Sequence, residues 1–421
     1  MPARARARSR QHSRSGPLPE LARLRSAAAV RERCALVHRW VANGRSPHFT
    51  LDESRLAAVA NYVAGVTRAS YPDLVIPYHS RWRHFCAGGI DRWQALAREL
   101  DADDLERART AIDLVTVSVL LDAGAGEAWR YRERESGLCL ARSEGLAVAS
   151  FAMFRAGAFS ADPKHPWRVD EVALARMDGP TLSRHFQVES DNPLVGLEQR
   201  GALLRRLGRA LARRPDLFGR APARPGHLVD CFRNACDGRI PAAMVLTTLL
   251  EGLASIWPSA LTLDGFAVGD AGHHPAVRAG DATDGIVPFH KLSQWLAYSL
   301  IEPLQSAGLE VTGADELTAL AEYRNGGLLV DLGVIRARAP IDPRVHHEVA
   351  CEPVVEWRAL TVAVMDRLLP LVRAELGLDG GFGMAQLLQG GTWSAGRKIA
   401  RALRPPEGPP PIAVAADGTV F

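Results

Sequence analysis

The sequence predicts a mainly α protein, a single compact multi-helix domain with a few short β-strands or hairpins. Apolar residues recur at helical spacing over most of the chain, whereas alternating stretches are short and few. The chain shows no internal repeat and no long linker. Its 421 residues, 47% hydrophobic and 23% charged, suffice for one large buried core. We expect residues 21–421 to form this domain, as one unit or as two lobes that meet near residues 200–225.

Residues 1–20 are expected to form a disordered basic tail. The first seventeen residues carry five arginines and no acid, which is more than the whole net charge of +4. The rest of the chain is therefore close to neutral, and neither nucleic acid nor a membrane is expected as a partner. The six cysteines include no CxxC pair, and no signal peptide or membrane span is evident. This pattern favours a cytoplasmic protein with reduced thiols.

Helices in the first half of the chain follow from apolar periodicity. The segment 113–121 is apolar nearly all round, which predicts a buried helix, and Asp122-Ala123-Gly124-Ala125-Gly126 supplies its stop. Asp191-Asn192-Pro193 predicts a further helix start, with a polar cap before a proline. The other helices expected in this half are residues 27–40, 53–67, 91–100 and 146–154.

The second half continues the helical pattern with one expected hairpin, residues 261–270, around Gly265. Pro288 is expected to begin a helix that runs to about residue 306, and Thr392 to begin the last helix. Helices are also expected at residues 242–256 and 354–376. The proline-rich residues 405–421 are expected to be extended and to dock on the body through their apolar side chains, Ile412, Val414, Val420 and Phe421.

The segment Glu322-Tyr323-Arg324-Asn325-Gly326-Gly327 is the strongest candidate for a functional site. An acid, a phenol, a guanidinium and an amide stand side by side before two glycines that permit close approach of the backbone. A mostly apolar run follows, so these polar groups lie at the edge of something buried. The alternative is a Glu–Arg pair that only fixes a turn.

A second candidate region is the helix expected after Pro288. Four polar side chains with mixed donors and acceptors recur at every fourth residue and so share one stripe: His290, Gln294, Tyr298 and Glu302. Lys291 and Trp295 flank this stripe. Such a stripe suits a polar small molecule, and the alternative is a partly buried face bonded to neighbouring loops.

Two basic regions are candidates for binding an anion. In an extended strand His79, Arg81 and Arg83 would share one face, and arginines grip phosphate or carboxylate bidentately. Arg397 and Lys398 follow a glycine-rich turn that opens a helix, a favourable place for an anion. The alternatives are an exposed basic loop and a simple Thr392 cap.

Several carboxylates stand in apolar surroundings, where burial raises a carboxyl pKa and a nearby arginine lowers it: Asp122, Glu144, Asp270, Asp331 and Glu356. Glycoside hydrolases often use one carboxylate of each kind, although most of these are expected to be structural ion pairs. No HExxH, Walker, GxGxxG or G-x-S-x-G pattern occurs, so no metal and no cofactor is expected.

Taken together, these motifs resemble the uracil-catabolism protein 4 family, over essentially everything after residue 25. The matching motifs are Arg81-Trp82-Arg83-His84-Phe85, Asp122-Ala123-Gly124-Ala125-Gly126, Arg142-Ser143-Glu144-Gly145-Leu146, Asn192-Pro193-Leu194, Pro288-Phe289-His290-Lys291, Glu322 to Gly327, Glu356-Trp357-Arg358, Gly391-Thr392-Trp393 and Asp417-Gly418-Thr419-Val420-Phe421. More distantly, Glu322-Tyr323-Arg324 is similar to the Asp-Tyr-Arg of the helical queuosine-nucleotide N-glycosylases, with glutamate in place of aspartate.

The resemblance implies a hydrolase that cleaves the N-ribosyl bond of a ribosylurea-type intermediate, with or without a 5′-phosphate, and releases urea. It also implies a functional link to a GTP-cyclohydrolase-II-like enzyme that supplies this intermediate. In this interpretation Glu322, kept charged by Arg324, stabilises the sugar cation, and His290 or Glu302 protonates the leaving group. Gln294 and Tyr298 would hold urea or ribose hydroxyls. Any 5′-phosphate would be bound by four basic residues, Arg81, Arg83, Arg397 and Lys398.

Two alternatives belong to other functional classes. An amidohydrolase would cleave a C–N bond of the urea itself and release ammonia and carbon dioxide. A non-catalytic partner would channel the product of the cyclohydrolase-like enzyme and would show no turnover of its own.

Overall fold

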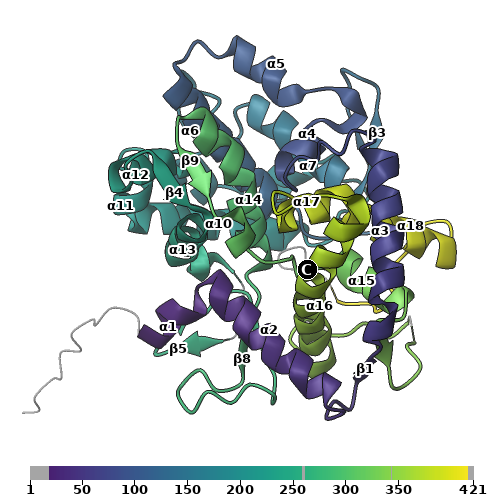
Figure 1. Ribbon diagram of the computed structural model, residues 1–421. Coiled ribbons are helices and arrows are strands. Elements are labelled where there is room, and N and C mark those ends of the chain that lie inside the picture. Colours follow the sequence, from purple (N-terminus) through teal and green to yellow (C-terminus); the bar gives the residue numbers. More distant parts are fainter. Residues whose placement is uncertain (1–18, 258–260, 343, 416–421) are drawn as a thin grey trace, which may run out of the picture.

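Helices make up most of the fold, and the strands are only two or three residues long (Figure 1). The structure is a computed structural model that describes residues 19–257, 261–342 and 344–415. The predicted mainly α class is confirmed. The expected tail, residues 1–20, lies outside the described residues except for Pro19 and Glu20, which begin the first helix.

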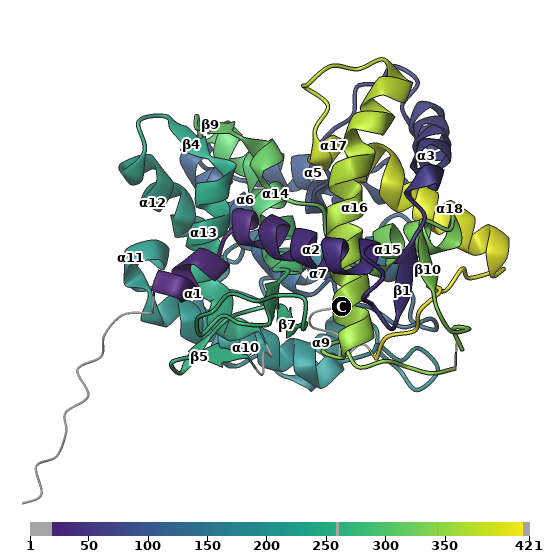
Figure 2. The same cartoon turned by 60° about the horizontal axis from the view of Figure 1, so that its bottom comes forward.

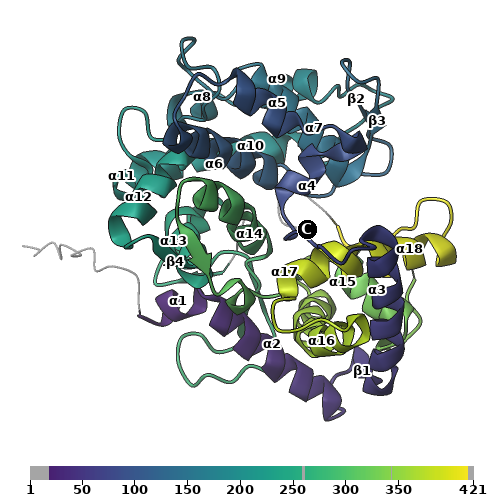
Figure 3. The same ribbon diagram turned by 45° about the horizontal axis from the view of Figure 1, so that its top comes forward.

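One set of helices packs around α14 (Lys291–Ser306), in which nearly every side chain is buried. Helix α6 (Asp104–Leu120) lies along it, and α13 (Ala242–Leu253) covers another side (Figure 3). Asp103 caps α6 by accepting a 2.7 Å hydrogen bond from the backbone N–H of Glu106. The other helices of this set are α4 (Arg81–Phe85), α5 (Arg92–Glu99), α7 (Arg142–Arg155), α8 (Glu171–Ala175), α9 (Gly179–His185), α10 (Leu197–Arg213), α11 (Pro215–Phe218) and α12 (Leu228–Ala235).

A second set packs around α16 (Glu352–Leu376), the longest of the described helices. Helices α2 (Ala27–Ala42) and α3 (Leu56–Ser70) lie along α16, and α2 crosses the face that is turned forward in Figure 2. Gly377 adopts a left-handed conformation (φ 71°) and ends α16. The remaining members are α1 (Pro19–Leu24), α15 (Tyr323–Asp331), α17 (Met384–Leu387) and α18 (Trp393–Leu403).

The strands form five two-stranded pairs among the described residues, and they connect segments rather than build a layer. The predicted hairpin at residues 261–270 is confirmed as β5 with β6, closed by a turn at Asp264 and Gly265 with positive φ. The β4–β9 pair is parallel and the other four are antiparallel. The pairs are β1 (Phe49–Leu51) with β10 (Ile335–Ala337), β2 (Tyr131–Arg132) with β3 (Cys139–Leu140), β4 (Arg239–Pro241) with β9 (Glu310–Thr312), β5 (Thr262–Leu263) with β6 (Phe266–Ala267), and β7 (Ala271–His273) with β8 (Ile286–Pro288).

The helix start predicted at residues 191–193 is wrong, because α10 begins at Leu197. The Asn192 side chain accepts a hydrogen bond from the Arg130 N–H (2.7 Å) and donates to the carbonyl oxygens of Arg130 (2.8 Å) and Gln187 (2.7 Å). It therefore bonds to a distant segment of backbone rather than capping a helix.

The start predicted at Pro288 is also displaced. Pro288 pairs with Ala271 in β8, and the next backbone N–H groups, up to that of His290, donate to the carbonyl oxygen of Asp270. His290 is left-handed (φ 49°), and α14 begins only at Lys291.

The glycine-rich turn before the last helix is not an open loop. Residues 388–392 form a π-helical turn between α17 and α18, and Thr392 has helical φ and ψ without a side-chain cap. A Cβ atom on Gly391 would collide with Val63 of α3, so the turn is packed against that helix. The anion site predicted at this turn has no exposed backbone to use.

Candidate active site

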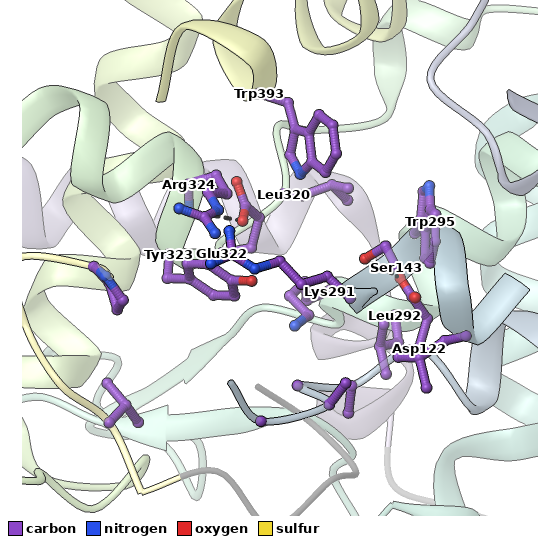
Figure 4. Close-up of a pocket in the computed structure, with 18 of the residues that line it drawn as sticks. Asp122, Ser143, Lys291, Leu292, Trp295, Leu320, Glu322, Tyr323, Arg324 and Trp393 are labelled. Carbon is purple, nitrogen blue, oxygen red and sulfur yellow. Dashed lines mark hydrogen bonds between the residues drawn. The ribbon is translucent and has the colours of Figure 1, made fainter. Parts of the chain in front are cut away.

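A cavity of about 500 Å³ is lined by residues from both sets of helices. That volume is in the range of roughly 300–1,000 Å³ typical of small-molecule sites. Its walls come from the segment 122–127 that follows α6, the starts of α7, α14 and α15, the first residue of α18, and the segment 409–414. Figure 4 shows Glu322, Tyr323 and Arg324 on one side, Asp122 and Ser143 on the other, and Lys291 between them.

Glu322 is the N-cap of α15, and its position is fixed by that role. Its two carboxylate oxygens accept hydrogen bonds from the backbone N–H groups of Asn325 (2.6 Å) and Arg324 (2.7 Å). Each oxygen keeps a further lone pair for a ligand. Burial holds the pKa of Glu322 above its usual value, and the two backbone N–H groups and the charges of Lys291 and Arg324 offset this only in part. The result is an oriented carboxylate whose basicity depends on neighbouring charge.

Lys291 is the first residue of α14, and Asp270 holds its backbone in place. Asp270 accepts from the N–H of Lys291 (2.9 Å) and from both terminal nitrogens of Arg358 on α16 (2.9 and 2.8 Å). The Lys291 side chain is 7% exposed and lines the cavity. Burial and the Arg358 charge lower its pKa to about 8, against the opposing effects of Asp270, Glu322 and Asp122. An amine of this pKa can give up its proton near neutral pH.

Asp122 follows the end of α6 and supplies the second carboxylate of the cavity. It accepts from the buried guanidinium of Arg81 (2.7 Å) and from the Ser143 hydroxyl (3.2 Å). Burial holds the pKa of Asp122 above its usual value, and Arg81, Ser143 and Lys291 offset this only in part. Arg81 also donates to Ser118 (2.7 Å) and to the carbonyl oxygen of Ser143 (3.1 Å), so it joins α4, α6 and α7 behind the wall of the cavity.

Aromatic rings cover the polar centre. The rings of His79 and Trp295 stack with centroids 6.0 Å apart, and Trp393 lies 6.3 Å from His79 and 5.8 Å from His84. Burial lowers the pKa of His79 to about 4, and burial with the nearby Arg81 charge lowers that of His84 well below its usual value. Both imidazoles are therefore neutral at pH 7. Tyr323 adds a ring on the opposite side, next to Glu322 (Figure 4).

The C-terminal segment closes one side of the cavity. Its backbone pairs with His347 through Ala413 (2.9 Å) and Ala415 (2.9 Å), and Ile412 is 5% exposed. The expected docking is therefore confirmed for Ile412 and Val414, while Val420 and Phe421 lie outside the described residues.

Six of the residues selected from the sequence line this one cavity: Glu322, Tyr323, Arg324, Lys291, Trp295 and His79. Asn325 does not, because its side chain turns back to the carbonyl oxygen of Leu320 (3.4 Å). From the sequence alone, Asp122 is only a carboxylate in apolar surroundings, and Ser143, Arg142, His84 and Trp393 are not expected at the site. All five stand in motifs that carried the family resemblance, which was the available signal.

The polar stripe of α14 does not face the cavity. Gln294 exchanges two hydrogen bonds with Thr318 (2.6 and 2.9 Å), and the Tyr298 hydroxyl donates to the carbonyl oxygen of Thr318 (3.1 Å). The Nε2 atom of His290 lies 3.0 Å from the carbonyl oxygen of Leu24. These side chains satisfy the backbone of neighbouring segments, the alternative that the sequence left open.

The remaining charged candidates make their contacts outside the cavity. Arg83 and Glu302 form an ion pair, which Ser80 extends by donating to Glu302 (2.9 Å). Arg397 pairs with Glu144 (2.6 Å). Lys398 is exposed, with its amine 5.8 Å from the centroid of the Tyr62 ring.

The described part of the chain lacks two features, a membrane-spanning helix and a cluster of metal ligands. No helix there combines the length and apolar character needed to cross a bilayer. No three His, Cys, Asp or Glu side chains of the described segments gather as metal ligands would.

Comparison with known proteins gives long and consistent matches. A family model described as a protein of unknown function, DUF1688, matches residues 23–421. Protein urg3 of Schizosaccharomyces pombe is 38% identical over 384 residues, 89% of this chain and 92% of that protein. Uracil catabolism protein 4 of Lachancea kluyveri is 37% identical over 432 residues, 94% of this chain and 98% of that protein. The resemblance drawn from the motifs is thus confirmed, and the chain belongs to the DUF1688 family.

Proposed function

We propose that this protein acts in uracil catabolism and hydrolyses the N-ribosyl bond of a ribosylurea-type intermediate to release urea. The similarity to uracil catabolism protein 4 supports the pathway. The reaction class rests on one observation: the oriented carboxylate of Glu322 and the ammonium of Lys291 line one aromatic-walled cavity.

Breaking the bond between C1′ and nitrogen leaves positive charge on the sugar. A carboxylate held close to C1′ stabilises this charge more strongly in the transition state than in the ground state. Glu322 would lie against C1′ and accept a proton from the water whose oxygen adds there. Its backbone hydrogen bonds fix its orientation before the substrate arrives.

The urea nitrogen leaves readily only if it gains a proton. Lys291 is assigned this role, because it lines the cavity with a pKa of about 8 and is within electrostatic reach of Glu322. From the sequence alone, His290 or Glu302 is the expected proton donor. Neither side chain lines the cavity, so Lys291 replaces them in the proposal.

The remaining groups would bind the sugar. Asp122, held by Arg81 and Ser143, can accept hydrogen bonds from ribose hydroxyls. The rings of Tyr323 and Trp393 offer apolar faces to the carbon skeleton. Arg81 is a positioning residue here, since it acts through Asp122.

The test is to incubate purified protein with ribosylurea and its 5′-phosphate and to identify the products by mass. Urea and the free sugar are expected. Glu322→Gln should reduce turnover by roughly 100-fold to 10,000-fold while the fold persists. Glu302→Gln is the matched control, because it removes a carboxylate of α14 that pairs with Arg83 outside the cavity.

Three outcomes would reject the proposal. Wild-type turnover by Glu322→Gln would remove its central residue. Ammonia and carbon dioxide in place of urea would indicate an amidohydrolase acting on the ureide C–N bond. Absence of turnover, together with a stable complex with a GTP-cyclohydrolase-II-like enzyme, would indicate a non-catalytic partner.

A further inference from the structure

Arg142 has an unusual position in the cavity wall. It is the first residue of α7 and one of the few described non-glycine residues with positive φ (54°). Its Nη2 donates to the backbone carbonyl (2.7 Å) and the carboxylate (3.2 Å) of Glu407. Its Nη1 is buried and has no hydrogen-bond partner among the described residues. A buried N–H donor on a charged group calls for an acceptor.

Arg324 brings a second guanidinium to the same cavity. It donates to the carbonyl oxygen of Gly408 (2.9 Å), and in the described part of the chain it forms no ion pair. Both guanidinium groups line the wall, and they repel one another. Burial and then this repulsion by the Arg324 charge lower the pKa of Arg142. An anion between them would relieve this repulsion.

The start of α7 adds a third contribution. Ala141 precedes this 14-residue helix and offers no side-chain cap, while Arg142 and Ser143 line the cavity. The positive end of the helix dipole therefore faces the cavity without a capping acceptor from Ala141.

We propose that Arg142, Arg324 and the start of α7 form a phosphate subsite, so that the substrate is a 5′-phosphorylated ribosyl compound. This inference rests on the proposed function and names its substrate class. Arg324 stands in the first turn of α15, directly after the Glu322 cap, and the two side chains lie next to each other in Figure 4. A sugar with C1′ at Glu322 would therefore place its substituent within reach of Arg324. A phosphate monoester fits two guanidinium forks, which donate to oxygens in pairs.

The cations expected from the sequence to bind phosphate do not line the cavity. Arg81 binds Asp122, Arg83 binds Glu302 and Arg397 binds Glu144. Arg142 and Arg324 replace them because these two line the cavity that holds Glu322.

Binding of ribose 5-phosphate and of ribose, measured by isothermal titration calorimetry, tests the subsite without any turnover. The wild-type protein should bind ribose 5-phosphate at least roughly tenfold more tightly than ribose. Arg142→Gln and Arg324→Gln should each weaken ribose 5-phosphate binding by roughly 10-fold to 100-fold and change ribose binding by less than about twofold. Arg142→Lys should recover part of the loss, because it restores the charge without the fork.

Arg404→Gln is the matched control. Arg404 also holds the C-terminal segment, through the carbonyl oxygen of Pro409 (2.7 Å), but it does not line the cavity. It should leave the preference for the phosphorylated sugar intact. Unfolding temperatures of all variants establish that each one is folded.

Equal affinity for the two sugars, or no measurable binding of either, would overturn the subsite. So would an equal loss of both affinities in the arginine variants. The results distinguish an error in the proposed subsite from an error in the proposed reaction. Ribose 5-phosphate binding that depends on Arg142, without urea release from any ribosylurea, would reject the reaction and keep the subsite. Urea release with no preference for the phosphorylated sugar would reject the subsite and keep the reaction.

Discussion

Glu322 combines two tasks that a residue usually performs separately. As an N-cap it satisfies two backbone donors of α15, and as a cavity residue it presents a carboxylate to a ligand. Capping does not prevent the Glu322 carboxylate from contacting a ligand, because each oxygen accepts only one backbone hydrogen bond. A cap has no side-chain freedom to lose on binding, so the carboxylate is preorganised.

Lys291 leads to a prediction about pH. A proton donor acts only while protonated, and the pKa of Lys291 is about 8, so kcat/KM should fall as the pH rises through about 8. Lys291→Met should reduce kcat/KM by roughly 100-fold and remove this alkaline limb. The measurement is kcat/KM for urea release between pH 6 and 10. Lys398→Met is the control, because this exposed lysine packs over Tyr62 away from the cavity. An unchanged alkaline limb in Lys291→Met would assign the proton to another group.

The same residues show what a sequence can reveal about a site. Three adjacent polar side chains of different chemistry, Glu322, Tyr323 and Arg324, predicted a site from local sequence alone. All three side chains line the cavity. Gln294 and Tyr298 were selected because helical spacing puts them on one face. Spacing cannot show what covers that face, and here it is the Thr318 segment.

At the scale of elements, neutral histidines connect α4, α14 and α18. His79 packs against Trp295 and Trp393 and bonds to Gln389 (3.0 Å). Its pKa is lowered to about 4, so the folded protein binds this proton less readily than the unfolded chain, whose histidine pKa is about 6.5. The neutral His79 therefore contributes to the free energy of unfolding above pH 6.5, and this contribution is lost as the pH falls towards 4.

The expected result is a loss of about 2 kcal/mol in the free energy of unfolding between pH 7 and pH 5 from His79 alone. Urea unfolding of the wild type and of His79→Gln at both pH values measures this loss. The free energy of unfolding of His79→Gln should fall by about 2 kcal/mol less than that of the wild type. His165→Gln is the control, since that side chain is exposed. Equal pH dependence in wild type and His79→Gln would show that His79 titrates normally in the folded protein.

The C-terminal segment is the second element with a testable role. Gly408 has φ 63°, and a Cβ atom there would lie 2.7 Å from the backbone nitrogen of Arg401 in α18. Gly408→Val should therefore displace the segment that lines the cavity and raise KM for urea release by roughly tenfold, with little change in the unfolding temperature of the helical body. Gly380→Ala is the control, because no atom lies within 4 Å of its added Cβ. A wild-type KM in Gly408→Val would show that the segment does not shape the site.

The boundaries of elements were less predictable than their existence. Helix α2 begins at Ala27 as predicted, because its apolar period is continuous. Pro288 looked like a helix start, yet it lies in β8 because β7 is available to pair with it. Local chemistry permitted both outcomes, and a segment distant in the sequence decided between them.

At the scale of the whole molecule, the cavity exists only when both sets of helices are assembled. Asp122 and Arg142 come from the first set, Lys291 from its central helix, and Glu322 from the second set. No single segment of the sequence contains a complete site. This explains why the motifs were recognisable one by one while their convergence was visible only in three dimensions.

Because the cavity walls come from distant segments, a bound ligand should affect all of these segments together. A ligand in the cavity should slow amide hydrogen exchange at once in segments far apart in sequence, because ligand binding reduces local opening of all the walls it contacts. Glu322→Gln incubated with ribosylurea 5′-phosphate should show protection at residues 122–127, 142–146, 291–295, 320–324 and 412–414, measured by mass spectrometry. Helix α12 is the internal control, since it contributes nothing to the cavity. Protection confined to the smaller 250 Å³ cavity beside Arg83 and Glu302 would place the ligand there and exclude Glu322 from the reaction.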